Sequence, residues 1–131
     1  KKIANIAFVD NIGPISRSHL PKLLKANHLY ILPSKDEALG VSLLEAASAG
    51  LFLIGSRVGG IPEIIKDGET GFLFSLNEKS SLINAIRKYS DLTTIERSQI
   101  IQQSQKHVKS FDKQIMLKKL ENIYENSFSN I

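Results

Sequence analysis

Apolar and polar residues along the first 76 positions follow two periods in turn, one typical of strands and one typical of helices. Short apolar runs predict strands, over residues 3–8, 28–33, 51–56 and 71–74. Apolar residues at helical spacing predict helices between these runs, over residues 17–26 and 40–49, with a short third helix from about Ile61. Strands that are apolar on both faces are typical of a parallel sheet covered by helices, and we expect residues 28–33 to form a central strand.

Turn and cap signals bound these elements. Ser16 or Ser18 is a candidate N-cap for the first helix, and Gly50 is a candidate stop for the second. Beyond residue 76 the pattern is helical only, and it predicts helices over residues 78–89, 94–108 and 112–126. The sequence therefore predicts one α/β domain over residues 1–131: a Rossmann-like parallel sheet with helices on both faces, then an all-helical C-terminal part over about residues 77–131.

Composition narrows the classes to which the chain can belong. Its 131 residues suit one compact domain, and 42% apolar with 23% charged residues is typical of an ordinary soluble protein. Because there is no cysteine, disulfides and thiolate metal sites are excluded. No apolar run reaches the roughly 18 residues of a membrane span, and the first residues lack the features of a signal peptide. We therefore expect a cytoplasmic protein.

The net charge of +4 lies mainly in the C-terminal part, where residues 77–131 carry nine Lys and Arg against six Asp and Glu. Five lysines fall in the last predicted helices, at Lys106, Lys109, Lys113, Lys118 and Lys119. A solvated helix face explains them, and the alternative is a weak attraction to an anionic surface at the inner membrane face or to a nucleotide. We expect no nucleic-acid partner, because no aromatic residues interleave with these lysines and no recognition motif is present.

A parallel sheet of this kind binds its ligands beyond the carboxyl ends of its strands. Four loops of this chain meet at that edge, comprising residues 9–15, 34–40, 56–61 and 75–77. Two of them carry glycine immediately before a helix, Gly40 in one and the Gly59-Gly60 pair in the other. Glycine at a helix N-terminus lets an anion such as phosphate approach the unpaired backbone N–H groups.

Two glutamates flank the start of the second helix: Glu37 in the loop before it and Glu45 about one turn into it. Carboxylates there would repel a lone phosphate, but they accept hydrogen bonds from hydroxyl groups. A nucleotide-sugar has this layout, since its diphosphate separates a ribose from a transferable sugar. The pattern thus favours a glutamate on each sugar and the helix start on the diphosphate. The alternative is that the loop acidic residues only complement the helix dipole.

The segment LPSKDEALGVSLLEAASAGLFLIGSRVGGIPEIIKDGETGFLF carries several motifs in a defined order. They are Pro33-Ser34, Glu37, Glu45-Ala46, Gly50, Gly59-Gly60-Ile61-Pro62-Glu63, Gly68 and Gly71. This order and spacing resemble the C-terminal, donor-binding domain of retaining glycosyltransferases of the GT-B fold, family 4, also called glycosyl transferases group 1. The resemblance covers about residues 6–74 and continues more loosely through the C-terminal helices.

The resemblance implies roles for individual residues. Glu37 matches a glutamate near the donor sugar and phosphates, and is the catalytic candidate, one that orients the sugar rather than acting as a simple general base. Glu45 matches the glutamate that holds the ribose hydroxyls. Residues 9–12 match a loop that touches the nucleobase. The other donor-binding candidates match backbone that meets the diphosphate or lies close to the pocket: Leu39, Gly40, Val41, Ser42, Gly59 and Gly60.

The resemblance also implies a UDP-, GDP- or ADP-sugar donor, a saccharide or lipid-linked acceptor, and neither a metal nor another cofactor. Family members have two domains, so we expect a larger enzyme that supplies an N-terminal acceptor domain. The isolated chain would then be an inactive fragment that is marginally stable or associates. The chain departs from the family pattern at Ala38, where glycine is usual, at Leu39, where an aromatic residue is usual, and after Gly50, where proline is usual. These departures bear on the phosphate contacts more than on the fold.

Other functions fit parts of the pattern. A non-catalytic nucleotide-binding or interaction module of the same fold is consistent with Ala38 and with the short chain. A flavodoxin-like FMN domain or a phospho-receiver domain fits less well, because the early acidic cluster of a receiver is missing from the sequence. The histidines lack the spacing of metal ligands, and no Ser–His–acid pattern is present. Two edge-loop cations are candidates for phosphate contact or for plain surface charge, Lys35 and Arg57.

Overall fold

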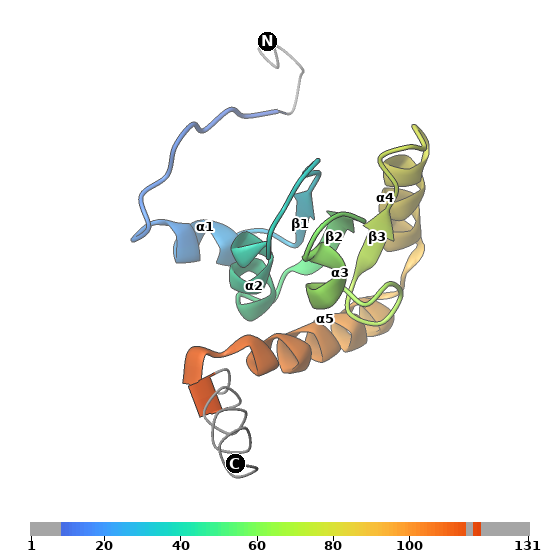
Figure 1. Ribbon diagram of the computed structural model, residues 1–131. Coiled ribbons are helices and arrows are strands. Elements are labelled where there is room, and N and C mark those ends of the chain that lie inside the picture. Colours follow the sequence, from blue (N-terminus) through green and yellow to red (C-terminus); the bar gives the residue numbers. More distant parts are fainter. Residues whose placement is uncertain (1–8, 115–116, 119–131) are drawn as a thin grey trace, which may run out of the picture.

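The computed structural model describes residues 9–114 and 117–118. The strand expected over residues 3–8 and most of the helix expected over residues 112–126 lie outside the described residues. Within them, three strands form one parallel sheet in the order β1-β2-β3 (Figure 1). The strands are β1 (Leu29–Leu32), β2 (Phe52–Ser56) and β3 (Phe72–Phe74).

The middle strand of the described sheet is β2. All five of its residues are buried, whereas the four residues of β1 are only half-buried and pair with β2. Of the described strands, only β2 has a neighbour on each side. The expected central place of residues 28–33 depends on a further strand over residues 3–8, which lie outside the described residues. An apolar run indicates burial, but the neighbours of a strand follow from long-range pairing that the run does not contain.

Helices cover both faces of the sheet, as the sequence predicts (Figure 1). The first three pack on one face and the fourth on the other, while the fifth contributes to both. They are α1 (Leu20–Lys25), α2 (Val41–Ser48), α3 (Ile61–Ile64), α4 (Ser81–Asp91) and α5 (Thr94–Val108), followed by the 3-10 helix η1 (Lys109–Phe111). This is the α/β, Rossmann-like arrangement expected from the alternation of strand and helix patterns.

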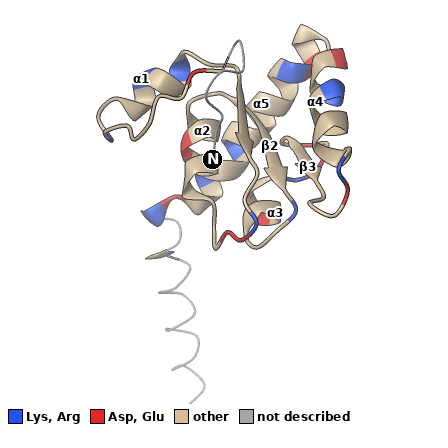
Figure 2. Ribbon diagram, turned by 90° about the horizontal axis from the view of Figure 1, so that it is seen from above, with Lys and Arg blue, Asp and Glu red and all other residues tan. Residues whose placement is uncertain are grey.

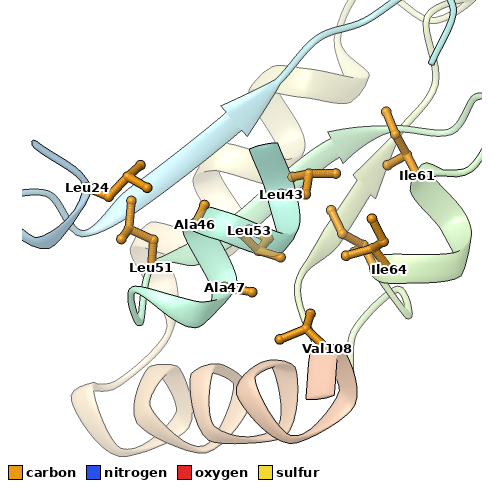
Figure 3. Packing of buried hydrophobic residues seen from close by; sticks show 10 residues of the cluster. Leu24, Leu43, Ala46, Ala47, Leu51, Leu53, Ile61, Ile64 and Val108 are labelled. Carbon is orange, nitrogen blue, oxygen red and sulfur yellow. The ribbon is translucent and has the colours of Figure 1, made fainter. Parts of the chain in front are cut away.

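Alternate side chains of β2 enter two hydrophobic clusters on opposite faces of the sheet. Phe52 and Ile54 pack against α4, where the ring centroid of Phe52 lies 4.9 Å from that of Tyr89. Leu53 belongs to the other cluster, which includes side chains of α2 and α3 and is shown in Figure 3. The buried members of that cluster are Leu24, Leu43, Ala46, Ala47, Leu51, Leu53, Ile61, Ile64, Ile65 and Val108. These two clusters hold the helices that carry the candidate site.

Helix α5, which runs beneath the sheet in Figure 1, joins the two clusters. Ile100 and Ile101 in its middle pack against the cluster that contains Phe52 and Ile54, here called the α4 cluster. Val108 at the end of α5 belongs to the cluster that contains Leu53, here called the α2–α3 cluster. The ring Nε2 of His107 lies 2.8 Å from the backbone oxygen of Glu63 in α3. Because a carbonyl oxygen only accepts, Nε2 carries the proton in this bond. This bond links the end of α5 to α3.

The first helix begins later than the sequence predicts, at Leu20 rather than at residue 17. Neither Ser16 nor Ser18 caps it. His19 is the N-cap residue, and its ring Nδ1 lies 2.6 Å from Ser16 Oγ. The serine hydroxyl therefore binds the histidine ring instead of a free helix N–H, a competition between local partners that residue preferences do not settle.

Two other helix boundaries illustrate when local signals suffice. α2 ends as expected, because Gly50 adopts a φ of +86° and the following Leu51 N–H donates to the Ala46 carbonyl at 3.1 Å. α4 begins at Ser81, later than predicted, because residues 78–80 form a turn in which the Ser81 N–H donates to the Glu78 carbonyl at 3.0 Å. A glycine stop is a strong signal, whereas a helix start without a side-chain cap is a weak one.

Basic and acidic residues are interspersed along the surface helices, as on α4 (Figure 2). Several large apolar side chains are also exposed, among them Val41 at the start of α2 and Ile95 in α5. In the part of the chain that the structure describes, no helix is both long enough and apolar enough to span a bilayer.

Candidate functional site

The loop after β1 carries Glu37 to the start of α2. Its side chain is half-buried, and its Oε1 accepts a hydrogen bond of 3.1 Å from the Gly40 N–H. The carboxylate is therefore held at the helix N-terminus by one oxygen. Among the described residues, its second oxygen has no hydrogen-bond partner, so it remains available to a donor such as a hydroxyl group.

The first turn of α2 presents free backbone donors. Its N-cap is Gly40, which adopts left-handed φ and ψ of 77° and 51° that glycine allows without strain. Within the described residues, the N–H groups of Val41 and Ser42 have no acceptor. The Val41 side chain is exposed, whereas Leu39 packs against the α2–α3 cluster. Two unpaired donors at the positive end of an eight-residue helix form a place for an anion.

The Gly59-Gly60 loop after β2 lies directly against the loop that carries Glu37. The Gly60 N–H donates to the Glu37 backbone oxygen at 3.0 Å. A Cβ on Gly59 would lie 1.8 Å from that same oxygen, and one on Gly60 would lie 2.3 Å from the Ala38 oxygen. Glycine is required here because backbone meets backbone. The structure thus brings together Glu37, Leu39, Gly40, Gly59 and Gly60, as the sequence analysis expected of neighbouring edge loops.

Glu45 lies one turn further along α2 and faces a different neighbour. It is half-buried and lines a cleft of about 520 Å³ between α1 and α2. Arg17 and Lys25 bring positive charge to this cleft, while Leu20 and Leu24 form part of its apolar wall. Neither Glu37 nor the glycine loop lines it. The single crevice expected from the sequence is therefore two regions, the start of α2 and the α1–α2 cleft.

Sequence reasoning missed the two cations of this cleft. Arg17, Leu20, Pro21, Leu24 and Lys25 recur at positions three or four apart, so they share one side of the chain around α1. That spacing was visible, but only the tertiary structure shows that this side faces Glu45. In the described residues neither Arg17 nor Lys25 forms an ion pair.

The two edge-loop cations proposed for phosphate contact, Arg57 and Lys35, differ in whether they form an ion pair. Arg57 donates to Asp67 at 2.7 Å, and the second oxygen of Asp67 accepts from the Leu73 N–H at 2.9 Å. Arg57 therefore secures the turn before β3 rather than standing free for a phosphate. Lys35 is exposed and forms no ion pair among the described residues. Glu63 lies exposed in the first turn of α3, the position expected of a residue that complements the helix dipole.

A metal site has no support in the described residues. They contain no group of three or more histidine and acidic side chains placed to hold an ion.

Ser56 is fully buried at the carboxyl end of β2. Its hydroxyl donates to the Ser34 carbonyl at 2.6 Å, and the Leu32 carbonyl lies 3.4 Å away. No sequence motif predicts this hydrogen bond, because it joins positions 22 residues apart.

Comparison with known proteins now bears on this arrangement. The family model of "Glycosyl transferases group 1" matches residues 3–107. Over 75 residues the chain is 39% identical to the UDP-Gal:alpha-D-GlcNAc-diphosphoundecaprenol alpha-1,3-galactosyltransferase of Escherichia coli, a match that covers 57% of this chain and 19% of that protein. The chain spans less than a quarter of the length of the curated relatives it matches first.

Solved structures agree with the fold. The C-terminal domain of a glycosyl transferase group 1 family protein (LpcC) from Francisella tularensis is 29% identical, with a TM-score of 0.62 over 76% of this chain and 51% of that one. Anabaena Alr3699/HepE in complex with UDP-glucose has a TM-score of 0.67 at 24% identity, covering 88% of this chain and 31% of that one. The family match extends over most of the chain and the sheet has the same architecture, so the chain belongs to the glycosyl transferases group 1 family, whose domains have the GT-B glycosyltransferase fold.

Proposed function

We propose that this chain is the donor-binding, C-terminal domain of a retaining glycosyltransferase. The parent enzyme transfers a sugar from a nucleoside-diphosphate sugar to a saccharide or lipid-linked acceptor. One observation carries the proposal: along the chain, the unpaired N–H groups of Val41 and Ser42 follow a half-buried Glu37 and precede Glu45, which lines the α1–α2 cleft. That is the order of sugar, diphosphate and nucleoside in such a donor.

The start of α2 would bind the diphosphate. Free N–H groups and the positive end of the helix dipole favour an anion there, and the absence of a Cβ at Gly40 lets it approach the backbone. As the bond to the sugar breaks, negative charge grows on the leaving diphosphate. Donors that are already oriented stabilise that charge at no cost in reorganisation. Val41 and Ser42 therefore act through their backbone.

Glu37 would orient the donor sugar. One carboxylate oxygen is fixed by the Gly40 N–H, which leaves the other to accept a hydrogen bond from a sugar hydroxyl. A carboxylate already anchored at one oxygen loses little rotational freedom when it binds, so it positions the sugar efficiently.

The α1–α2 cleft would hold the nucleoside. Its volume of about 520 Å³ lies in the range of small-molecule pockets. Glu45 would accept hydrogen bonds from the ribose hydroxyls, Leu20 and Leu24 would contact the base, and Arg17 or Lys25 would lie toward the phosphates. The E. coli relative is named for a UDP-Gal donor and the Anabaena neighbour was solved with UDP-glucose, which supports a nucleotide-sugar ligand of this kind.

The partners of the domain follow from the same proposal. A donor site at the edge of this sheet needs a second, acceptor-binding domain to complete the reaction centre. A lipid-linked acceptor would bring the enzyme to the inner face of a membrane, where the exposed Lys106 and Lys109 would add a weak attraction to anionic lipid.

Titration of the chain with UDP, GDP and ADP, followed by calorimetry, tests the proposal. We expect saturable binding of one of the three. The change Glu45→Ala should weaken it roughly tenfold to a hundredfold, because it removes charge-assisted hydrogen bonds to the ribose hydroxyls. Glu69→Ala is the matched control, since Glu69 is an exposed acidic residue in the turn before β3 and should leave the affinity unchanged.

A different pair of results would favour the non-catalytic module. If none of the three nucleotides binds and the full-length gene product transfers no sugar from any nucleotide-sugar, the donor-binding proposal is wrong. Equal affinities in the unaltered chain and in Glu45→Ala would show that the nucleoside does not bind in the α1–α2 cleft.

A further inference from the structure

The pairing of β1 with β2 stops just before the loop that carries Glu37. In the register of the two strands, Leu32 is the partner of Gly55, so the next residues in line are Pro33 and Ser56. Proline has no N–H and cannot extend a ladder of backbone hydrogen bonds. The first residues of the Glu37 loop therefore lack the support that a continued strand would provide.

The side chain of Ser56 supplies that support. The residue has 0% exposure, and its hydroxyl donates to the Ser34 carbonyl at 2.6 Å, with the Leu32 carbonyl a longer 3.4 Å away. A hydroxyl has a single proton to donate, so the shorter contact dominates. In this way a side-chain bond replaces the missing ladder bond one residue beyond Pro33.

A second anchor holds the loop three residues later. The Gly60 N–H donates to the Glu37 backbone oxygen at 3.0 Å. The carboxyl end of β2 and its following loop therefore grip the Glu37 loop at Ser34 and at Glu37 itself. Between these two points the backbone has little freedom, and the Glu37 side chain then reaches the Gly40 N–H at 3.1 Å.

We propose that Ser56 is a positioning residue, which holds the Glu37 loop so that the Glu37 carboxylate meets the donor sugar. The inference rests on the proposed function for its ligand, but its geometric part concerns the loop alone. Ser56 itself is buried and touches no ligand. It acts through Ser34 and the backbone of the loop.

Ser104 provides a matched control for this inference. It is the other serine that is almost fully buried among the described residues, with 1% exposure, and its hydroxyl has no partner there. Ser104→Ala removes a buried hydroxyl just as Ser56→Ala does, but in α5 and with no hydrogen bond to the loop. A second pair covers the case in which Ser56→Ala fails to fold. Ser56→Thr and Ser56→Val have the same shape and differ only in the hydroxyl.

The test measures the affinity of the chain for two ligands and, separately, amide hydrogen exchange without ligand. The ligands are the nucleoside diphosphate that the unaltered chain binds and the corresponding hexose conjugate. Ser56→Ala should lower the affinity for the sugar conjugate roughly tenfold relative to the free diphosphate, because only the sugar meets Glu37. Ser56→Thr should restore the ratio that Ser56→Val loses, and Ser104→Ala should keep it.

Amide hydrogen exchange at Gly40 and Gly60 is read without ligand. We expect faster exchange at both in Ser56→Ala and Ser56→Val, and unaltered rates in Ser56→Thr and Ser104→Ala. Unchanged exchange would overturn the inference whatever the chain binds, and so would an equal loss of affinity for both ligands. If no nucleotide binds but the Ser56 variants alone speed exchange, the function assigned to the site fails while the positioning role of Ser56 stands.

Discussion

At the scale of single residues, the two adjacent glycines of the edge loop are required for different reasons. Gly59 is exposed and has a φ of +49°, in the region where side chains are strained. Gly60 is buried with an ordinary φ of −80°, and only the close approach of the neighbouring backbone excludes a side chain. The two glycines are adjacent in the sequence, but a Cβ on each would clash with a different backbone oxygen, that of Glu37 for Gly59 and that of Ala38 for Gly60.

Gly59→Ala should therefore be much more harmful than the same change at Gly68. Both positions have positive φ, which costs about 1 kcal/mol for alanine. At Gly68 nothing lies within 4 Å of the added Cβ, whereas at Gly59 the Glu37 oxygen would be 1.8 Å away. We expect the free energy of unfolding to fall by about 1 kcal/mol in Gly68→Ala and by about 2–4 kcal/mol in Gly59→Ala. Urea denaturation measures both, and equal losses would contradict the contact.

At the scale of elements, α5 shows a helix start set by its own sequence. Thr93 is the N-cap, its hydroxyl accepts from the Glu96 N–H at 3.2 Å, and the Glu96 carboxylate accepts from the Thr93 N–H at 2.7 Å. This reciprocal capping box lies within four residues, which is why the predicted start at residue 94 agrees with the structure. α1 and α4 have no side-chain cap, and both start later than predicted.

The capping box makes part of the stability depend on pH. The hydrogen bonds from Thr93, first from its backbone N–H and then from its hydroxyl, lower the pKa of Glu96 below its ordinary value of about 4.5. A lowered pKa in the folded state means that the bonds stabilise the protein fully above about pH 4.5 and lose effect as pH falls through the folded pKa. The unaltered chain should thus be more stable than Glu96→Gln at neutral pH.

Denaturation of both proteins across the acid range checks this expectation. The difference in unfolding free energy between the chain and Glu96→Gln should shrink steadily as the pH falls below about 4.5. A difference that stays constant down to about pH 3 would show that the charge of Glu96 does not contribute.

At the scale of the whole molecule, the described sheet is unequally protected. β2 is buried on both sides, while the four apolar residues of β1 stay half-buried at the end of the described sheet. Large apolar side chains are also exposed elsewhere, Ile95 at 71% and Ile12 at 60%. Strand ends and apolar surface of this kind favour contact with another chain or domain.

We therefore expect the isolated 131-residue chain to be marginally stable or to associate. Sedimentation at rising concentration should show species larger than the monomer, or else denaturant unfolding should have a low midpoint. A cooperative unfolding transition of a stable monomer, independent of concentration, would contradict the expectation. Ile95→Lys is a useful companion, since it places a charge on one exposed apolar position with little effect expected on the fold.

The sequence by itself determined the kind and order of the elements between residues 17 and 108, together with the family. These features depend on signals a few residues apart: apolar runs, helical spacing, the Gly50 stop and the Thr93 cap. The position of Glu37 and Gly40 near one helix start was also expected, because both belong to one short segment, whereas the hydrogen bond between them was not. The roles of the candidate donor-binding residues remain predictions.

Only the tertiary structure decided how the described strands pair, which side of α1 faces Glu45, and that the Ser56 hydroxyl bonds to the Ser34 carbonyl at the start of the Glu37 loop. Each of these depends on the packing of segments about 20 or more residues apart. Such contacts arise from the joint burial of many side chains and not from the preference of any one of them. For this reason the chemistry of the site could be proposed from the sequence, while its support and its division into two regions could not.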